Sequence, residues 1–202
     1  MTVGPEYFDG MYAASPDPWG LQSRWYERRK YAVTMALLPA ERYRDAFEPG
    51  CSIGVLTGLL AGRCDRLLSF DAAAAAAETA ARRNAAHPNV RVEQRLLPGD
   101  WPDGRFDLIV FSELLYYFGE DDLRDVLRLA AGALRPGGSL IAVHWRHPVA
   151  EYPRSGDDAH AAIGRQPGLA RLAAYSDPDF LAEVYVRADG APASVAQSGG
   201  LA

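Results

Sequence analysis

A glycine-containing turn and an aspartate about twenty residues further on are the clearest chemical signals in this chain. The turn consists of Glu48-Pro49-Gly50-Cys51-Ser52-Ile53-Gly54, and Asp71 ends the apolar segment 67–70. Gly50 lets the backbone turn and lets a ligand approach where no Cβ is in the way. The carboxylate of Asp71 could accept hydrogen bonds from ribose hydroxyls. The structural alternatives are a tight turn without a ligand and an aspartate that only caps the next helix.

The spacing of these residues does not match a dinucleotide site. The pattern G-x-G-x-x-G would place its first glycine at Glu48, where a pyrophosphate needs close approach to the backbone. A carboxylate there suits a ligand with positive charge. The pattern Glu-x-Gly-x-x-x-Gly resembles the motif of methyltransferases that use S-adenosylmethionine (AdoMet), which carries an amino group and a sulfonium. An NAD-dependent oxidoreductase shares the fold plan and stays open as an alternative.

The elements that must position these residues alternate along the chain. We expect strands at 45–48, 65–70, 90–94, 106–112 and 139–145, helices at 20–38, 53–62, 72–86 and 121–134, and a turn at 136–138. Two further strands are expected at 169–176 and 180–188. This order predicts an α/β fold. The predicted fold is a Rossmann-like, doubly wound, mostly parallel seven-stranded sheet with helices on both faces and an antiparallel edge hairpin.

The chain is expected to form a single domain over residues 1–188, followed by a disordered tail at 189–202 that is rich in Gly, Ala and Ser. Residues 1–38 are expected to form an N-terminal lid and helix. The lid, residues 1–19, is aromatic and rich in proline, with few helix or strand signals. In the helix, Leu21, Trp25, Ala32 and Met35 suggest the buried stripe. The basic run 28–30 is interpreted as a solvated face, with anion contact as the alternative.

Composition excludes several classes of protein. The 202 residues include 21 Lys and Arg against 26 Asp and Glu, a net charge of −5, which argues against nucleic acid as a partner. The two cysteines form neither a disulfide scaffold nor a CxxC metal site, so no metal is expected. No apolar run reaches the roughly 18 residues of a membrane span, and the first residues lack a secretory signal. We expect a cytoplasmic protein without a membrane partner, as a monomer or homodimer.

Several further segments carry a more specific resemblance. Residues 106–110 and 134–138 are similar to class I AdoMet-dependent methyltransferases. Asp17-Pro18-Trp19, Tyr26-Glu27-Arg28, the segment 112–117 and His144-Trp145-Arg146 resemble the NodS-like group, whose namesake N-methylates an amino sugar unit in nodulation-factor synthesis. The resemblance covers roughly residues 7–165. It implies AdoMet as the cofactor and a small molecule, such as an amino sugar, as the acceptor.

The resemblance also implies a role for each matching position. The expected cofactor contacts are Trp19, Arg24, Glu48, Gly50, Cys51, Gly54, Asp71, Ala72, Leu96, Leu97 and Ser112. Glu113, His144 and Tyr117 are expected to act on the acceptor as catalytic residues. Tyr12, Tyr116, Trp145, Arg146 and His160 are expected to bind it.

Methyl transfer from a sulfonium needs mainly alignment and a dry site, whereas an amine acceptor must also lose a proton. Glu113, His144 and His160 are the candidates for orienting the acceptor or taking that proton. Core packing is the alternative role for the tyrosines, and a structural role is the alternative for the histidines. The sequence thus predicts a small-molecule N-methyltransferase. An O-methyltransferase and a non-catalytic AdoMet-binding module are the alternatives.

Overall fold

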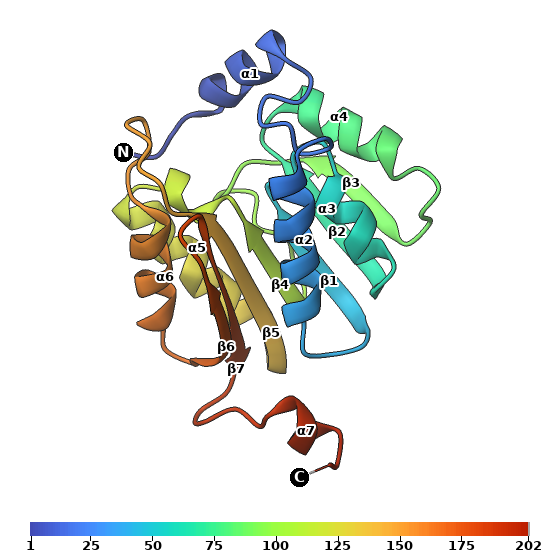
Figure 1. Cartoon of the computed structure of the whole chain (residues 1–202), viewed down its shortest axis with the longest axis vertical. Helices are drawn as coiled ribbons and strands as arrows, with labels where there is room; N and C mark the ends of the chain where they lie inside the picture. The colour runs from blue at the N-terminus through green and yellow to red at the C-terminus, as the bar shows by residue number, and fades with distance from the viewer. Residues whose placement is uncertain (202) are drawn as a thin grey trace.

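A twisted sheet forms the centre of the computed structural model, which describes residues 1–201 (Figure 1). Within these residues the strands are β1 (Tyr43–Pro49), β2 (Cys64–Asp71), β3 (Val90–Gln94), β4 (Phe106–Ser112), β5 (Leu134–Trp145), β6 (Leu169–Ser176) and β7 (Phe180–Arg187). Their order is β3-β2-β1-β4-β5-β7-β6. The first five are parallel, and β7 pairs antiparallel with both β5 and β6. The predicted fold class is confirmed, and the strand order reverses between β1 and β4.

Helices cover both faces of this sheet. The helices of the described residues are α1 (Pro5–Ala14), α2 (Trp25–Leu37), α3 (Val55–Ala61), α4 (Ala74–Arg83), η1 (Leu115–Tyr117), α5 (Glu120–Ala133), α6 (Gly156–Gly164) and α7 (Val195–Ser198). The helices α2, α3 and α4 lie together on one side, and α5 and α6 lie on the other (Figure 1). The helix α1 crosses above the sheet, far from α7 (Figure 1).

The two apolar cores follow from the alternation of side chains along each strand. In β4, Leu108 and Val110 join the core under α2 and α3, whereas Ile109 and Phe111 join the core under α5. All four are fully buried. A central strand of this kind has no solvent face, which explains its continuous apolar sequence.

Three expectations on secondary structure need correction. Residues 136–138 lie inside β5, which begins at Leu134, because the pairing with β4 shifts register there and absorbs the extra residues. The arm contains the helix α1, which starts with Pro5 in its first turn, a position that proline favours. The tail contains the short helix α7, capped by Ser194. Residue 202 of the expected tail lies outside the described residues.

The buried side of α2 also differs from the expected one. The helix buries Glu27, Lys30, Tyr31 and Thr34, which follow the spacing of one helical face. Trp25 is 69% exposed. The basic run is not a single face, since successive residues of a helix point in directions about 100° apart. None of the helices in residues 1–201 has the length and hydropathy that crossing a membrane requires.

Candidate active site

A cavity of about 470 Å³ lies beyond the carboxyl ends of the parallel strands, at the point where the strand order reverses. This is the position at which open α/β sheets bind ligands, and the volume falls in the range of small-molecule sites. Residues of the loops after β1, β2, β3 and β4 line it, together with α1 and the start of α2. Of the expected residues, those on the cavity are Tyr12, Trp19, Arg24, Glu48, Gly50, Cys51, Asp71, Ala72, Leu96, Leu97, Ser112, Glu113, Tyr116, Tyr117 and Trp145.

The loop after β1 turns tightly at the cavity floor. Gly50 has φ +72°, and a Cβ there would lie 3.0 Å from Leu114. The backbone N–H groups of Gly50 and Cys51 both donate to the Phe70 carbonyl, at 2.7 and 3.1 Å. The loop is thus pinned to β2 and presents bare backbone to the cavity, as a close-fitting ligand requires.

Asp71 joins this loop to the end of β2. Its Oδ2 accepts the Ser52 N–H at 2.8 Å, and its Oδ1 accepts the Ala73 N–H at 3.0 Å. The N-cap of α4 is Ala73 rather than Asp71. Burial raises the pKa of the Asp71 carboxyl, against the hydrogen bonds that stabilise its charge. Ala72 beside it and Leu96 and Leu97 after β3 add an apolar wall.

Glu48 lies at the end of β1 and is 2% exposed. Its Oε2 accepts hydrogen bonds from the hydroxyls of Thr57 and Ser69, at 2.7 and 2.8 Å. Burial raises the pKa of Glu48 to about 7, from an ordinary value of 4.5. A ligand with positive charge would favour its ionised form.

Glu48 should therefore make the stability of the ligand-free protein depend on pH. The folded protein holds this proton up to about pH 7, whereas the unfolded chain releases it near pH 4.5. The stabilisation by the protonated group is thus lost as the pH rises through 7. We expect Glu48→Gln to be more stable than wild type at pH 8 by roughly 3 kcal/mol. At pH 4 we expect near-equal stability.

Urea unfolding at both pH values checks this expectation. The exposed Glu41 provides a matched control, since Glu41→Gln should shift neither value. A difference between Glu48→Gln and wild type that is the same at pH 4 and pH 8 would contradict it.

Gly54 is not on the cavity, and its place in the site is structural. It has φ +76°, and an added Cβ would lie 2.8 Å from Cα of Ala80 in α4. Its carbonyl accepts a hydrogen bond from Asn84 Nδ2 at 3.0 Å. Gly54 thereby lets α3 start close to α4, which holds the loop after β1 in place.

The N-terminal segment lies across the side of the cavity that the loop after β1 forms. Tyr12 on α1 shares a hydrogen bond of 2.5 Å with Ser52 Oγ, and its ring packs edge-on against Trp19 at 5.6 Å. Burial raises the pKa of the Tyr12 phenol. Arg24, the N-cap residue of α2, lines the cavity beside them.

Glu113 joins three elements at the opposite side of the cavity. It has φ +53°, in the left-handed region that a non-glycine residue seldom adopts. Its Oε1 accepts Lys30 Nζ at 2.6 Å. Its Oε2 accepts the Tyr116 hydroxyl at 2.5 Å and the Trp145 N–H at 2.9 Å. The strained backbone is thus held by three donors, as is common at functional sites.

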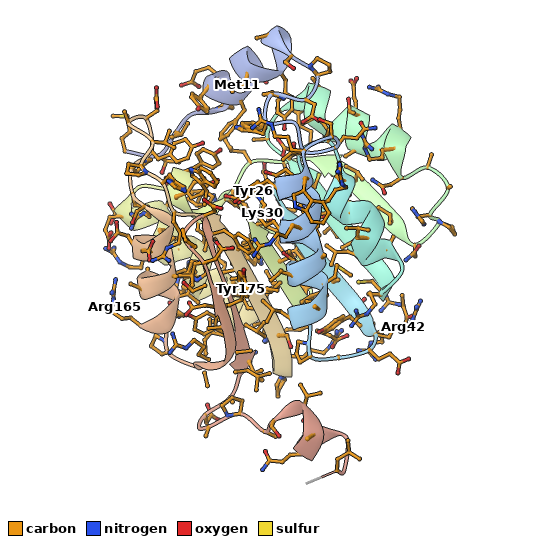
Figure 2. The ribbon with its side chains drawn as sticks, in the orientation of Figure 1. Met11, Tyr26, Lys30, Arg42, Arg165 and Tyr175 are labelled. Atoms are coloured by element: carbon orange, nitrogen blue, oxygen red, sulfur yellow. The ribbon has the colours of Figure 1, made fainter. Side chains whose placement is uncertain are left out.

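Lys30 carries the charge that balances this carboxylate. Its ammonium is buried in α2, between Glu113 and Glu27, whose Oε2 lies 2.9 Å away. Burial acts against the charge, but the two carboxylates raise the pKa of Lys30 above its ordinary value. Figure 2 shows Tyr26 and Lys30 on the side of α2 that faces the sheet.

Aromatic rings form the wall of this half of the cavity. Tyr116 stacks on Tyr152 at 4.7 Å, and the hydroxyls of Tyr117 and Tyr152 lie 3.1 Å apart. Phe8 of α1 packs edge-on against Tyr117 at 4.8 Å. Trp145 completes the wall against Tyr26, with ring centres 5.3 Å apart.

The structure does not place His144 and His160 on the cavity, contrary to the expectation. Both are buried in the core between β5 and α6. His144 Nε2 accepts the Leu115 N–H at 3.0 Å, which leaves the proton of the neutral ring on Nδ1. His144 Nδ1 therefore donates to His160 Nε2 at 3.1 Å, and His160 Nδ1 donates to Glu183 Oε2 at 2.7 Å.

This chain of hydrogen bonds holds η1 in place, because it ends at the Leu115 N–H. Burial lowers the pKa of His144, so the ring stays neutral and cannot donate from both nitrogens. Burial acts to raise the pKa of Glu183, but donors that include His160 and Arg171 hold it low, at about 2. The role of His144 is thus to fix the backbone that carries Tyr116 and Tyr117.

Removal of the His144 ring should destabilise the protein strongly. We expect His144→Leu to lower the free energy of unfolding by roughly 2–4 kcal/mol, because the Leu115 N–H and the His160 ring lose buried partners. Urea denaturation measures the change. His147 is exposed, so His147→Leu is the matched control with little expected effect. Equal stability of the His144 variant and wild type would show that the chain does not support the fold.

Arg146 also lies away from the cavity. Its guanidinium forms two hydrogen bonds with Asp157, at 2.8 and 3.0 Å, and one with the Asp177 carbonyl at 2.9 Å. It ties the end of β5 to α6 and to the turn between β6 and β7. This placement corrects the expectation that Arg146 binds the acceptor.

Several cavity residues were not predicted from the sequence: Tyr7, Phe8, Tyr26, Glu27, Lys30 and Tyr152. For Glu27 and Lys30 a signal was available, since they share helical spacing with Tyr31 and Thr34. Charged residues on such a face are easily assigned to solvent. Tyr152 lies in a loop after β5, where no periodicity marks it.

Known proteins with similar sequences were found. The family described as Nodulation protein S (NodS) matches residues 11–161, about three quarters of the chain. Nodulation protein S of Rhizobium tropici is 33% identical over 133 residues, which are 63% of this chain and 55% of that protein. The protein of the same name from Bradyrhizobium diazoefficiens is 33% identical over 132 residues, 64% of this chain and 59% of that protein. The matches thus span little more than half the length of these relatives.

Solved structures share the fold. The N-methyltransferase NodS from Bradyrhizobium japonicum WM9, in complex with S-adenosyl-L-homocysteine, has a TM-score of 0.82 at 21% identity, over 92% of this chain and 99% of that chain. A candidate methyltransferase from Pseudomonas syringae is 46% identical with a TM-score of 0.73, over 81% of this chain and all of that chain. The family match over most of the described fold carries the assignment: the chain belongs to the NodS family.

Proposed function

We propose that this protein is an AdoMet-dependent methyltransferase that methylates the amine of a small molecule, most specifically of an amino sugar. The observation that carries the proposal is the division of one cavity into two chemically different halves. The loop after β1 with Asp71 forms one half. The group of Glu27, Lys30 and Glu113 with its aromatic wall forms the other. The solved relatives named for methyltransferase activity support the same reaction class.

The residues of the first half fit AdoMet. The Asp71 carboxylate provides acceptors for ribose hydroxyls, and Leu96 and Leu97 provide an apolar wall for adenine. A Cβ at Gly50 would fill the space beside Leu114 that bare backbone leaves free. Arg24 lines the cavity and would pair with the cofactor's carboxylate, and α1 with Tyr12 would form the lid. When bound, AdoMet supplies an electrophilic methyl group.

The second half fits an amine on a sugar-like body. Aromatic faces bind both sugar rings and cations, and Tyr116, Tyr152 and Trp145 supply such faces. Two carboxylates against one ammonium leave this half with a net negative charge, which favours an acceptor that arrives as a cation. A hydroxyl acceptor has no such charge, so N-methylation is favoured over O-methylation.

The test uses two sugars that differ at one nitrogen. D-Glucosamine and N-acetyl-D-glucosamine share their ring hydroxyls, but the acetylated nitrogen is not nucleophilic. We expect the protein, with AdoMet as methyl donor, to methylate glucosamine only. Mass spectrometry of the product detects the added methyl group. Methylation of both sugars would point to O-methylation, and AdoMet binding without turnover of any amine or hydroxyl would point to a non-catalytic module.

A further inference from the structure

A buried carboxylate on α2 lines the acceptor half of the cavity with a single ion-pair partner. Glu27 is 5% exposed, and its Oε2 lies 2.9 Å from Lys30 Nζ, which Glu113 also holds. Among residues 1–201 no other group donates a hydrogen bond to this oxygen. The buried hydroxyl of Tyr26 has no partner among the same residues. Buried polar atoms of this kind are costly, and a ligand that donates hydrogens would satisfy them.

Glu113, the carboxylate expected to act as a base, differs from Glu27 because both of its oxygens accept hydrogen bonds. Its two oxygens already accept from Lys30, from the Tyr116 hydroxyl and from the Trp145 N–H, at 2.5 to 2.9 Å. Protonation of Glu113 would disrupt this set and release the elements that it joins. Glu113 thus serves to position Lys30 and Tyr116.

The place of Glu27 in the cavity also suits a proton acceptor. Lys30 connects Glu27 to Glu113. Leu114, which follows Glu113 in the chain, lies 3.0 Å from the position that a Cβ on Gly50 would take. The carboxylate therefore lies in the acceptor half and is connected, through Lys30 and Glu113, to the residue that packs against the loop proposed for the cofactor.

Resting on the proposed function, we infer that Glu27 takes the proton of the acceptor amine. The acceptor enters as an ammonium; an N–H bond breaks, an O–H bond forms on Glu27, and the electron pair stays on nitrogen. That pair forms the new N–C bond as the S–C bond electrons return to sulfur. The methylated ammonium leaves, and Glu27 returns its proton to solvent.

The charged and titratable groups around Glu27 are compatible with this cycle. Burial raises the pKa of Glu27, while Lys30 and Arg24 favour its ionised form and Glu113 opposes it. The phenols of Tyr26 and Tyr31 face the same carboxylate, and burial raises their pKa as well, so they stay protonated. A carboxyl with a raised pKa is a stronger base than a solvated one.

The experiment compares wild type with Glu27→Gln, which keeps the shape and loses the base. With D-glucosamine at pH 7, we expect turnover to fall about 100-fold, with partial recovery as the pH rises and the free amine becomes abundant. Binding of S-adenosylhomocysteine should not change. Glu41→Gln, at an exposed glutamate just after α2, is the matched control and should keep full turnover.

A second readout counts protons without turnover. Glucosamine is titrated into the protein saturated with S-adenosylhomocysteine, in buffers of different ionisation enthalpy at pH 7. We expect wild type to release close to no proton to the buffer, because Glu27 takes it, and Glu27→Gln to release about one proton per amine bound. Where the variant fails to fold, release of about one proton by wild type would still show that the proton goes to solvent and not to Glu27.

The inference is overturned if wild type releases about one proton on binding, or if Glu27→Gln keeps wild-type turnover at pH 7. It is also overturned if Glu113→Gln alone shows the altered pH profile. These failures differ from failure of the proposed function, in which wild type methylates no amine at all.

Discussion

Replacement of Asp71 by alanine is expected to lower the affinity for AdoMet about ten- to a hundredfold. The carboxylate is a charge-assisted acceptor for the ribose, and a bond of this type contributes roughly 1.5–3 kcal/mol. Its loss also frees the Ser52 and Ala73 N–H groups, which hold the loop after β1 in place. Calorimetric titration of the variant with AdoMet and with its demethylated product measures the effect.

Asp65 offers a matched control for Asp71 because it lies on the same strand. Its side chain is half exposed and pairs with Arg42 at the far end of β2. Asp65→Ala should bind AdoMet with wild-type affinity. A folded Asp71→Ala protein with the same affinity would remove Asp71 from the cofactor site.

Gly54→Ala is expected to lower the free energy of unfolding by roughly 2–5 kcal/mol. The left-handed backbone at φ +76° costs about 1–2 kcal/mol for a residue with a Cβ. The new methyl would also meet the backbone of α4 at 2.8 Å, and overpacking of this kind costs about 1–3 kcal/mol. Urea denaturation gives the sum of both contributions.

Gly137 separates the two contributions. It has the same φ of +76°, but no atom of residues 1–201 outside its chain neighbours lies within 4 Å of an added Cβ. Gly137→Ala should therefore show the backbone cost alone, about 1–2 kcal/mol. If both alanine variants lose the same stability, the close contact between Gly54 and α4 contributes nothing.

The parts of the fold that the sequence predicts are those specified by local patterns. The bounds of β3 and β4 match the prediction, because β4 is a short apolar run between polar turns and β3 alternates apolar with polar residues. The loop with Gly50 and the aspartate at the end of β2 lie, as predicted, at the edge of the sheet where the cavity is. Their positions follow from connectivity, since every parallel strand ends on the same edge.

The direction of each side chain at that edge was decided by the tertiary structure. His144 lies in β5, where successive side chains alternate between the two cores. This alternation turns the His144 ring toward α6 and away from the cavity. Nothing in the sequence around it states which face the helices α5 and α6 will cover.

The same limit applies to α2. Its sequence shows a helix, but the burial of Glu27 and Lys30 at the cavity depends on Glu113, which follows β4 and pairs with Lys30. A buried ammonium is stable only beside carboxylates that balance its charge. One of them, Glu113, lies 83 residues from Lys30 along the chain. The sequence by itself therefore determined the sheet, its order of elements and the place of the loop after β1. The packing of α2 on the sheet decided which charges face the cavity, because pairing between distant residues exists only in the folded chain.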